Sequence, residues 1–439
     1  MPHLPQRLAA LALLLTGLSC AAAESLPARL DAAIVGLEPQ IIEWRRDFHA
    51  HPELSNRETR TSERVAAHLK TLGLAVTTGI AHTGVVALLK GGKPGPVVAL
   101  RADMDALPVT EEVELPFRSN VKAEYGGQQV GVMHACGHDA HTAILMSVAQ
   151  ALVAVKDELP GTVKFIFQPA EEGAPAGERG GALLMREEGV LDNPKPDAIF
   201  GLHVVSGTPT GEIRYRSGPF MASNDWLSIK VNGRQTHGAW PWNGVDPVVT
   251  AAQIVTGLQN IVARQIDISK EPAVVTVATV NGGIRKNIIP DAVEMTGTIR
   301  TFDEPMRRDI HARVKQIAEA IALANGASAD VTIDTATTVT LNDPALTERT
   351  LPSLVRIAGK DKVRVSPRVM IAEDFSYFQE QVPGVFFFVG VTPPDEDMSK
   401  AASNHSPRFF VDEAALVTGA RALGAVAVDF LSANAPAAR

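Results

Sequence analysis

The stretch Phe165-Ile166-Phe167-Gln168-Pro169-Ala170-Glu171-Glu172-Gly173 joins an apolar, aromatic run to two adjacent glutamates. The run 163–167 is short and apolar, which predicts a buried β-strand. Side chains that leave such a strand at its carboxyl end lie where α/β sheets place their ligands. The stretch therefore predicts an α/β fold and also the edge of the sheet that carries the chemistry.

Similar runs continue on both sides of this stretch. Further apolar runs lie at 84–89, 97–100, 198–202 and 385–389, and helix-like periodicity lies at 63–72, 141–155, 178–188 and 414–430. This alternation predicts an α/β layer fold with a largely parallel sheet. A chain of 439 residues is also long enough for two domains.

The middle of the chain has a different order of elements. Between 217 and 336 the order is strand, helix, strand, strand, helix, strand, at 226–231, 248–262, 274–280, 292–302, 306–324 and 330–333. This βαββαβ order is typical of a ferredoxin-like layer of helices on an antiparallel sheet. We therefore expect a mixed α/β fold in which residues 24–216 and 337–439 form a catalytic domain and 217–336 form an inserted domain.

Composition and charge exclude some classes of partner. The hydrophobic content of 45% with 5% aromatic residues suits a soluble enzyme. The formal net charge of −8 argues against a nucleic-acid partner, which requires a basic face. No segment after the N-terminal one resembles a transmembrane span.

The first residues resemble an export signal. Arg7 precedes the apolar run 8–18, and Ala21-Ala22-Ala23 offers small residues for cleavage, so we expect residues 1–23 to be a signal peptide and the protein to be periplasmic or secreted. The run is too short for a membrane span, which needs ~20 apolar residues. Lipidation at Cys20 is the alternative, although Gly17 stands where leucine is normally found.

Removal of Cys20 would leave Cys136 as the one cysteine of the mature chain, with no intramolecular disulfide. It lies in the segment Met133-His134-Ala135-Cys136-Gly137-His138-Asp139-Ala140-His141, just before a helical stretch. Cys136 and His138 can both offer donor atoms to one metal centre, and Gly137 permits the tight backbone that this needs. The alternative is a helix-capping turn with buried polar groups.

Three further elements carry metal-competent side chains. The adjacent carboxylates of Glu171 and Glu172 repel each other unless a cation or a proton intervenes, although a solvated acidic loop is the simpler alternative. His203 follows the run 198–202, and His405 lies in a polar turn; each alone is more often a structural histidine. Together with Cys136 and His138, these side chains can furnish two adjacent metal sites, a recurring hydrolytic arrangement.

These segments resemble the aminoacylase/carboxypeptidase G superfamily of co-catalytic metallohydrolases, and within it the hippurate hydrolase and indole-acetyl-amino-acid hydrolase branch. The resemblance also includes 44–54, 101–108, 287–290, 372–375 and 405–407. It implies a ligand set of Cys136, His138, Glu172, His203 and His405, with Glu171 as general base and acid. Asp103 replaces the histidine of the superfamily's His-x-Asp pair, and Asp105 takes the orienting place. Two divalent ions are implied, with Mn, Zn, Co and Ni all open.

The inserted segment resembles the family's lid and dimerisation domain. The resemblance implies that His237 stabilises the oxyanion, often across a dimer interface, and that Asn287 and Arg300 hold the substrate carboxylate. A turn-capping asparagine and a solvated arginine are the alternatives. Trp240 and Trp242 depart from the family pattern; they predict a larger or more aromatic acyl group, unless they only pack the interface.

The resemblance predicts a metal-dependent amidohydrolase, a homodimer or higher oligomer, that cuts N-acyl amino acids or related small amides with Glu171 as the base. A metallo-dipeptidase or carboxypeptidase would share this chemistry. A periplasmic protein that closes on a ligand is a further alternative, but it has no need of a Glu-Glu pair beside Cys and His. We expect His51 and His134 to be structural or to support the ligands, and His68 and His311 to have no special role.

Overall fold

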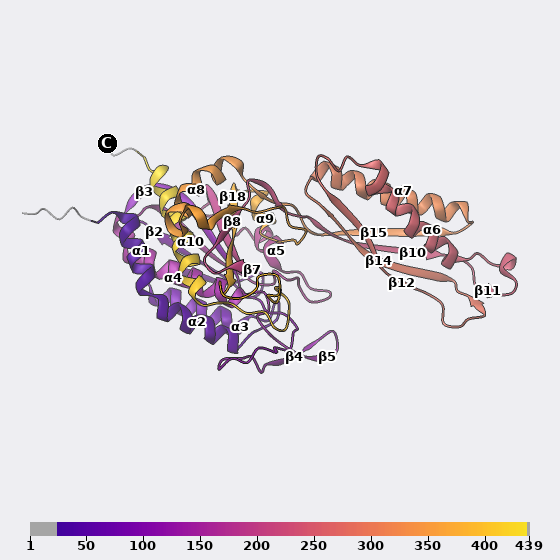
Figure 1. Cartoon of the computed structure of the whole chain (residues 1–439), viewed down its shortest axis with the longest axis horizontal. Coiled ribbons are helices and arrows are strands. Elements are labelled where there is room, and N and C mark those ends of the chain that lie inside the picture. The colour runs from indigo at the N-terminus through magenta and orange to yellow at the C-terminus, as the bar shows by residue number, and fades with distance from the viewer. Residues whose placement is uncertain (1–23, 437–439) are drawn as a thin grey trace, which may run out of the picture.

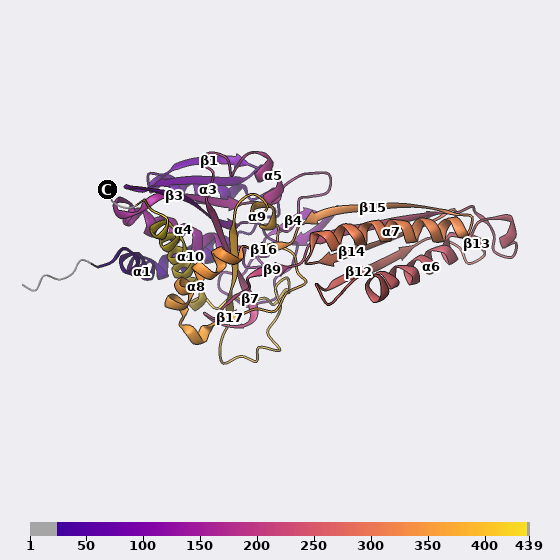
Figure 2. The ribbon, with the colours of Figure 1, turned by 90° about the horizontal axis from the view of Figure 1, so that it is seen from above.

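The computed structural model describes residues 24–436, so the predicted signal peptide 1–23, with Cys20, lies outside the described residues. The chain forms a compact body and an arm that projects from one side of it (Figure 1). Seen from above, the arm extends well beyond the body (Figure 2).

An eight-stranded sheet runs through the body, and its four central strands are parallel. Its order is β1-β2-β6-β3-β7-β18-β8-β17, and β6, β3, β7 and β18 pair in parallel, while β1, β2 and β8 add antiparallel pairings. The predicted mixed α/β fold with a largely parallel sheet is confirmed. The strand bounds are β1 Ala75–Ile80, β2 Gly84–Lys90, β3 Lys93–Asp103, β6 Pro160–Gln168, β7 Ala198–Pro209, β8 Ile213–Tyr215, β17 Val363–Val365 and β18 Gly384–Thr392.

Helices cover both faces of this sheet. Phe165 and Phe167 of β6 pack into the larger core, whereas Ile166 between them packs into the smaller one, because successive strand side chains point to opposite faces. The larger core lies under six helices: α1 Leu26–Gly36, α2 Glu38–Ala50, α3 Thr59–Thr71, α4 His138–Ala154, α8 Pro344–Ala358 and α10 Ala414–Ala433. The smaller core lies under α5 Gly181–Glu187 and α9 Ser376–Gln379.

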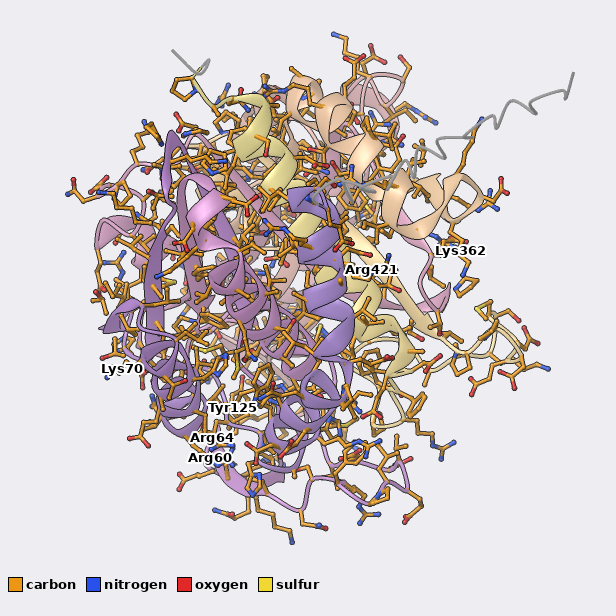
Figure 3. The ribbon with its side chains drawn as sticks, turned by 90° about the vertical axis from the view of Figure 1, so that its left-hand side faces the viewer. Arg60, Arg64, Lys70, Tyr125, Lys362 and Arg421 are labelled. Atoms are coloured by element: carbon orange, nitrogen blue, oxygen red, sulfur yellow. The ribbon has the colours of Figure 1, made fainter. Side chains whose placement is uncertain are left out.

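Helix α10 is a central helix of the body. By length and composition it could cross a membrane, but 67% of its most apolar window is buried inside the protein, as in the core helix of a folded domain. Arg421 of α10 pairs with Asp31 of α1 at 2.6 Å, on the side of the body opposite the arm (Figure 3). The helix therefore joins the N-terminal helices to the sheet.

The arm has the βαββαβ order that the sequence predicts. Its sheet has the order β12-β14-β10-β15, with all pairings antiparallel, and α6 and α7 share one apolar core with it. At the far end, β11 pairs with β13, and at the near end β9 pairs with β16 of the body. The bounds are β9 Gly218–Met221, β10 Asn224–Asn232, β11 Thr236–His237, α6 Pro247–Asn260, β12 Ala273–Asn281, β13 Ile288–Ile289, β14 Ala292–Thr301, α7 Glu304–Ala324, β15 Ser328–Thr337 and β16 Thr340–Asn342.

Some elements differ from the sequence-based expectations. Apolar periodicity did not predict helices α1, α2 and α8 or the hairpin of β4 (Lys122–Tyr125) and β5 (Gln128–Gly131). The helix predicted at 178–188 begins only at Gly181, whose φ of 69° interrupts a helical backbone. The side chain of Glu178, in the loop before α5, instead pairs with Arg57, which lies just before α3.

Candidate metal centre and active site

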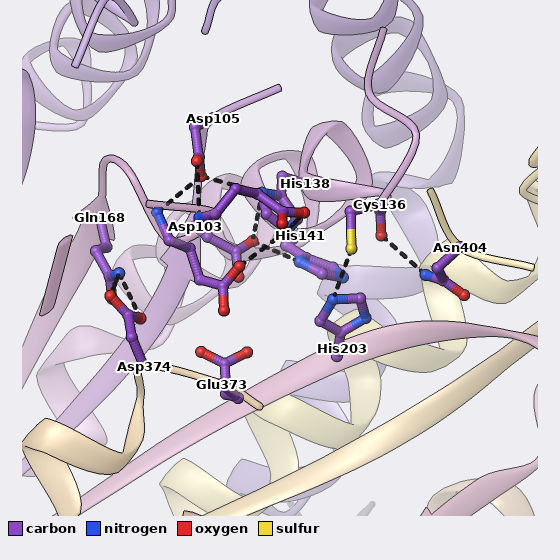
Figure 4. A network of polar contacts seen from close by, with 12 residues as sticks. Asp103, Asp105, Cys136, His138, His141, Gln168, His203, Glu373, Asp374 and Asn404 are labelled. Carbon is purple, nitrogen blue, oxygen red and sulfur yellow. Dashed lines mark hydrogen bonds and ion pairs between the residues drawn. The ribbon is translucent and has the colours of Figure 1, made fainter. Parts of the chain in front are cut away.

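The predicted ligands come from four separate segments and meet at the carboxyl edge of the parallel strands. Figure 4 shows three of them, Cys136, His138 and His203. Glu171 and Glu172 follow β6, and His203 lies within β7. Cys136 and His138 flank the start of α4, and His405 lies in the loop before α10. This is the edge of the sheet that the sequence predicts.

The turn at Gly137 brings Cys136 and His138 into the same cluster. Gly137 has a φ of 93°, in the left-handed region that favours glycine, and forms the cap of α4. A Cβ atom at Gly137 would lie 2.3 Å from Cγ2 of Val204, so the helix start also approaches β7 closely. Both requirements explain the glycine between the two donor residues.

Cys136 lies between two groups of potential ligands. Its Sγ is 3.3 Å from Nε2 of His203 and 3.2 Å from Nε2 of His405. His405 Nε2 is in turn 3.1 Å from Oε1 of Glu172. Within each of the groups Cys136–His138–His203 and Cys136–Glu172–His405, the donor atoms lie within 4.8 Å of one another. Two adjacent ions that share Cys136 fit this arrangement.

Asp105 orients both the histidine and the glutamate pair. Its Oδ1 accepts hydrogen bonds from the backbone N–H of Glu171 (3.1 Å) and from Nδ1 of His138 (3.2 Å). Its Oδ2 accepts from the N–H of Glu172 (3.0 Å) and from Ser55 Oγ (2.7 Å). Because Nδ1 of His138 donates to Asp105, Nε2 is left as the free donor atom for an ion.

Glu171 lies in an environment that favours its protonated form. Burial raises the pKa of Glu171 well above its usual value, and the carboxylates of Glu373, Glu172 and Asp374 add to this effect. The side chain is still 10% exposed, and its Oε2 lies 4.0 Å from Nε2 of His138. A carboxylate beside a ligand cluster, with a raised affinity for protons, is suited to general base and acid chemistry.

Comparison with known proteins assigns this arrangement to a family. The model of peptidase family M20/M25/M40 matches residues 99–429. Thermostable carboxypeptidase 1 of Saccharolobus solfataricus is 41% identical over 396 residues, which cover 90% of this chain and 96% of the relative. N-acetylcysteine deacetylase of Bacillus subtilis is 38% identical over 392 residues, which cover 89% and 96%.

A solved structure agrees with the sequence relatives. The crystal structure of the Bacillus subtilis YXEP protein, described as a dinuclear metal binding peptidase from the M20 family, has a TM-score of 0.74 and 36% identity over 91% of this chain and 99% of that one. The chain belongs to peptidase family M20/M25/M40. The resemblance inferred from the motifs is thereby confirmed, and the protein is a metal-dependent amide hydrolase.

The donor set of this M20 enzyme fits divalent ions. Nε2 of His138 is buried and has no hydrogen-bond partner among residues 24–436. Cys136 and His203 share a ligand group with His138, and Nε2 of His138 lies 4.0 Å from an oxygen of Glu171 and from one of Glu172. An unprotonated imidazole nitrogen among such groups suits a cation. The mixture of sulfur, nitrogen and oxygen donors suits Mn, Zn, Co or Ni and does not select among them.

Protons and metal ions compete for the same atoms of the M20 site. Burial lowers the pKa of His138, but the carboxylates of Asp103 and Asp105 outweigh burial and raise it to about 10. Burial raises the pKa of the Cys136 thiol well above its usual value, and Glu172 and Glu171 raise it further. A divalent ion must therefore displace the protons of His138 and Cys136 when it binds.

The arm carries the three remaining predicted residues of this M20 enzyme at its two ends. His237 and Asn287 lie in the β11–β13 region at the far tip, where Gly238 N–H donates to the backbone oxygen of Asn287 at 2.9 Å. Arg300 lies near the body end of β14, and burial lowers its pKa. The strand β10 between these ends has nine residues and spans roughly 30 Å, so the structure does not bring His237 and Asn287 to the ligand cluster of the same chain.

His237 at the tip is prepared to donate a hydrogen bond. The backbone N–H of Ala239 donates to Nδ1 of His237 at 3.0 Å, so in the neutral ring Nε2 carries the proton. The side chain of His237 is exposed, and the ring of Trp240 lies 5.4 Å from it. An exposed Nε2–H group suits a role as an oxyanion donor.

The remaining histidines lie outside the ligand set. His51 is exposed and contacts the backbone oxygen of Asp47, and His134 is buried with neither ring nitrogen bonded among the described residues. His68 packs edge-on against Trp44, and His311 contacts Asp225 within the arm.

Sequence reasoning assigned no role to Arg101, which is fully buried in β3 beneath the site. Its guanidinium donates to Asp103 (2.6 Å), Glu373 (2.9 Å) and Asp374 (3.0 Å). Arg101 thereby compensates three buried carboxylates, two of which, Glu373 and Asp374, lie beside Glu171. The signal that could have identified it is an arginine that directly follows the apolar run 97–100.

Proposed function

We propose that this M20 enzyme hydrolyses the amide bond of N-acyl amino acids, with Glu171 as the general base. The observation that carries the proposal is the position of Glu171, 4.0 Å from the free Nε2 of His138 and adjacent in sequence to the predicted ligand Glu172. N-acetylcysteine deacetylase, which is 38% identical over 89% of this chain, supports the substrate class.

In the proposed reaction, different residues bind the metal ions, transfer the proton and orient the site. Cys136, His138, Glu172, His203 and His405 would hold two divalent ions. When bound, such ions act as Lewis acids that acidify a water molecule and polarise the substrate carbonyl. Glu171 accepts the proton of the attacking water and delivers it to the departing nitrogen. Asp105 holds the backbone of Glu171 and Glu172 and the ring of His138 in place.

His237 would stabilise the oxyanion of the intermediate from a second copy of the chain. It lies at the far tip of the arm with Nε2–H free to donate, and we propose that a homodimer places this tip over the ligand cluster of the partner. Asn287, at the partner's arm tip beside His237, and Arg300, near the body end of β14 in the chain that holds the ions, would together hold the carboxylate of the substrate. The exposure of the apolar residues Val248 and Val249 of α6 supports such a dimer, in which they would lie in a contact between the two arms.

The test is the release of free amino acid by the purified protein from N-acetyl, N-butanoyl and N-benzoyl amino acids. Each reaction is run after chelator treatment and after addition of Mn²⁺, Zn²⁺ or Co²⁺. We expect the chelated protein to be inactive and one of the ions to restore hydrolysis. Bound metal at full occupancy without hydrolysis of any substrate would contradict the proposal.

A carboxypeptidase activity is the second candidate, because a relative that is 41% identical over 90% of the chain is named a carboxypeptidase. The bond is similar in both cases, since the C-terminal residue of a peptide is also an acylated amino acid with a free carboxylate. Dipeptides and tripeptides in the same panel distinguish the two. Cleavage confined to peptides would assign the protein as a peptidase.

The two exposed tryptophans at the arm tip indicate which acyl group the enzyme prefers. Trp240 is 56% exposed and its ring lies 5.4 Å from His237, so it would enter the partner's site together with His237. We propose that it contacts an aromatic acyl group. Trp240→Ala is then expected to lower kcat/KM for N-benzoyl substrates about tenfold more than for N-acetyl substrates. Trp226, which is also 56% exposed but lies near the body end of the arm, is the matched control.

We also propose that the protein is exported. Arg7, the apolar run 8–18 and Ala21-Ala22-Ala23 support this proposal. Cell fractionation with N-terminal sequencing of the mature protein tests it, with a start at residue 24 expected. An N-terminus at Met1 in the cytoplasmic fraction would contradict export, and a lipid on Cys20 would favour the lipoprotein alternative.

A further inference from the structure

His141 lies directly behind two of the ligand histidines and has no role in the proposed reaction. Its side chain is 1% exposed, and its ring centroid lies 4.6 Å from that of His203 and 5.4 Å from that of His138 (Figure 4). It belongs to the first turn of α4, which begins at His138. A ring in this place either binds an ion itself or holds the residues that do.

The hydrogen bonds of His141 exclude it as a ligand. Its Nδ1 lies 2.6 Å from Oδ1 of Asp103, and its Nε2 lies 2.8 Å from the backbone N–H of Val204. Because the backbone amide can only donate, Nε2 is an acceptor, and Nδ1 therefore carries the proton that Asp103 accepts. The donor atoms of Asp103, His138 and His141 do lie within 4.8 Å of one another, but His141 keeps no lone pair for an ion.

Asp103 fixes this tautomer because both of its oxygens are occupied. Oδ2 accepts from NH1 of Arg101 at 2.6 Å, and Oδ1 accepts from His141, so the carboxylate has a single orientation at the end of β3. Asp103, which stands where the wider family has a ligand, is thereby joined to His141.

The amide that His141 accepts from would otherwise be buried without a partner. β3 and β7 pair from Ala198 to Gly201 only, so the β7 backbone beyond Gly201 has no strand partner on that side. Val204 is fully buried, and an unpaired buried N–H costs about 1–3 kcal/mol. His141 supplies the acceptor that a neighbouring strand would otherwise provide, and it does so next to His203, the metal ligand of β7.

The backbone of Val204 in turn directs His203. The carbonyl oxygen of Val204, on the other side of its Cα from the N–H, lies 2.7 Å from Nδ1 of His203 and 3.1 Å from Nδ2 of Asn404. Since Nδ1 of His203 donates to this oxygen, Nε2 of His203 keeps its lone pair, and it lies 3.3 Å from Sγ of Cys136. The position of the Val204 backbone, held through its N–H by His141, therefore sets the direction of the donor atom of His203.

We propose that His141 is a positioning residue, which Asp103 holds in one tautomer and which fixes the backbone of Val204 in β7, through its N–H, so that the carbonyl oxygen of Val204 directs Nε2 of His203 at one of the two ions. The effect is confined to the ion of the Cys136–His138–His203 group, because His405 and Glu172 lie on other segments. The inference requires metal binding but no particular substrate, so it stands or falls separately from the proposed function.

Two substitutions separate the two hydrogen bonds of the ring. In His141→Gln the amide reaches about as far from the backbone as Nε2, so an acceptor for Val204 N–H is kept. In His141→Asn the amide reaches only as far as Nδ1, so Val204 N–H is left without a partner. Metal-stripped full-length protein is titrated with Co²⁺, with the visible spectrum of bound Co²⁺ and the bound stoichiometry as readouts.

We expect wild-type protein and His141→Gln to bind two Co²⁺ ions tightly. In His141→Asn one ion should bind as in wild type and the other roughly 10–100-fold more weakly, the usual effect of removing a group that orients a ligand. Asp103→Asn should cause the same selective loss, since the amide keeps only one acceptor oxygen; when that oxygen accepts from Arg101, the NH2 group faces Nδ1 of His141 and favours the other tautomer. Asp103→Asn therefore tests the proposal even if His141→Asn does not fold.

His134→Asn is the matched control, because His134 is equally buried at 2% exposure but bonds to nothing among the described residues. It should lower the unfolding temperature without selective loss of one ion. Retention of both tight sites in His141→Asn would overturn the proposal. Equal weakening of both ions, or a loss in His141→Gln as large as in His141→Asn, would also overturn it, because the role of His141 would then be merely structural.

Discussion

Glu171 and Glu172 are neighbours in sequence with different predicted tasks, and the same substitution at each position separates them. Glu171→Gln is expected to lower turnover by ~10²–10⁴ and leave two ions bound, because it removes a base and not a ligand. Glu172→Gln is expected to lower the bound metal, because Glu172 belongs to the Cys136–Glu172–His405 group. Metal analysis and kcat on both variants check this; substantial turnover in Glu171→Gln would contradict the assignment of the base.

Glu58 is a buried carboxyl group whose ionisation should affect stability. Burial raises the pKa of Glu58 from 4.5 to about 7, and Asp105 adds to the effect, although Thr83 and the N–H of Ala170 donate to it. A raised folded-state pKa gives stability that is fully present below pH 4.5 and lost as pH rises through about 7. The shift corresponds to about 3 kcal/mol.

The measurement compares urea unfolding of the metal-stripped wild type with that of Glu58→Gln at several pH values. The free energy of unfolding of the wild type should fall relative to the variant between pH 5 and pH 8, because only the wild type must ionise a buried acid on this interval. A difference that does not change with pH would show that Glu58 is not perturbed.

At the scale of elements, the start of α4 connects backbone geometry to the metal site. Gly137→Ala places a side chain in a left-handed conformation, at a cost of about 1–2 kcal/mol, and adds a Cβ only 2.3 Å from Cγ2 of Val204. Gly177→Ala is the matched control, since Gly177 also has a positive φ, of 83°, but has no atom within 4 Å of the added Cβ.

We expect Gly177→Ala to lower the free energy of unfolding only by the cost of a left-handed backbone. Gly137→Ala should lower it further and also weaken metal binding, because Cys136, His138 and Val204 must all shift. Chemical denaturation and metal analysis of the two variants measure these effects. Equal destabilisation, with two ions retained in Gly137→Ala, would show that the close approach of α4 to β7 is not needed.

At the scale of the whole molecule, the arm separates His237 from the ligand cluster of its own chain. If the second copy supplies His237, two inactive variants should restore each other in mixed dimers. Glu171→Gln and His237→Ala, expressed together in equal amounts, should recover about a quarter of wild-type activity, because half of the dimers are mixed and each has one complete site. Each variant alone is the control, and no recovery in verified mixed dimers would place His237 outside the site.

The sequence by itself determined the classes of element, the βαββαβ order of the arm and the identity of most groups at the site. Cys136, His138, Glu171 and Glu172 could be found because strand ends and tight turns are local features with local residue preferences. Helices α1 and α2 were not predicted because their apolar periodicity over a few turns is weak. Helix α8 was not predicted because it contains Pro352, which normally interrupts a helical pattern.

The tertiary structure alone decided which side chains meet. Asp103, His141 and Val204 are 38 and 63 residues apart along the chain, and only the parallel packing of β3 beside β7, with α4 across their ends, joins them by hydrogen bonds. The burial of Arg101 under three carboxylates and the distance of His237 from its own site are likewise properties of the packed molecule. Local sequence sets the direction of each side chain, but long-range packing sets what that side chain contacts. The physical reason is that buried charges must be balanced and buried backbone N–H and C=O groups must be hydrogen-bonded by segments far away in the chain.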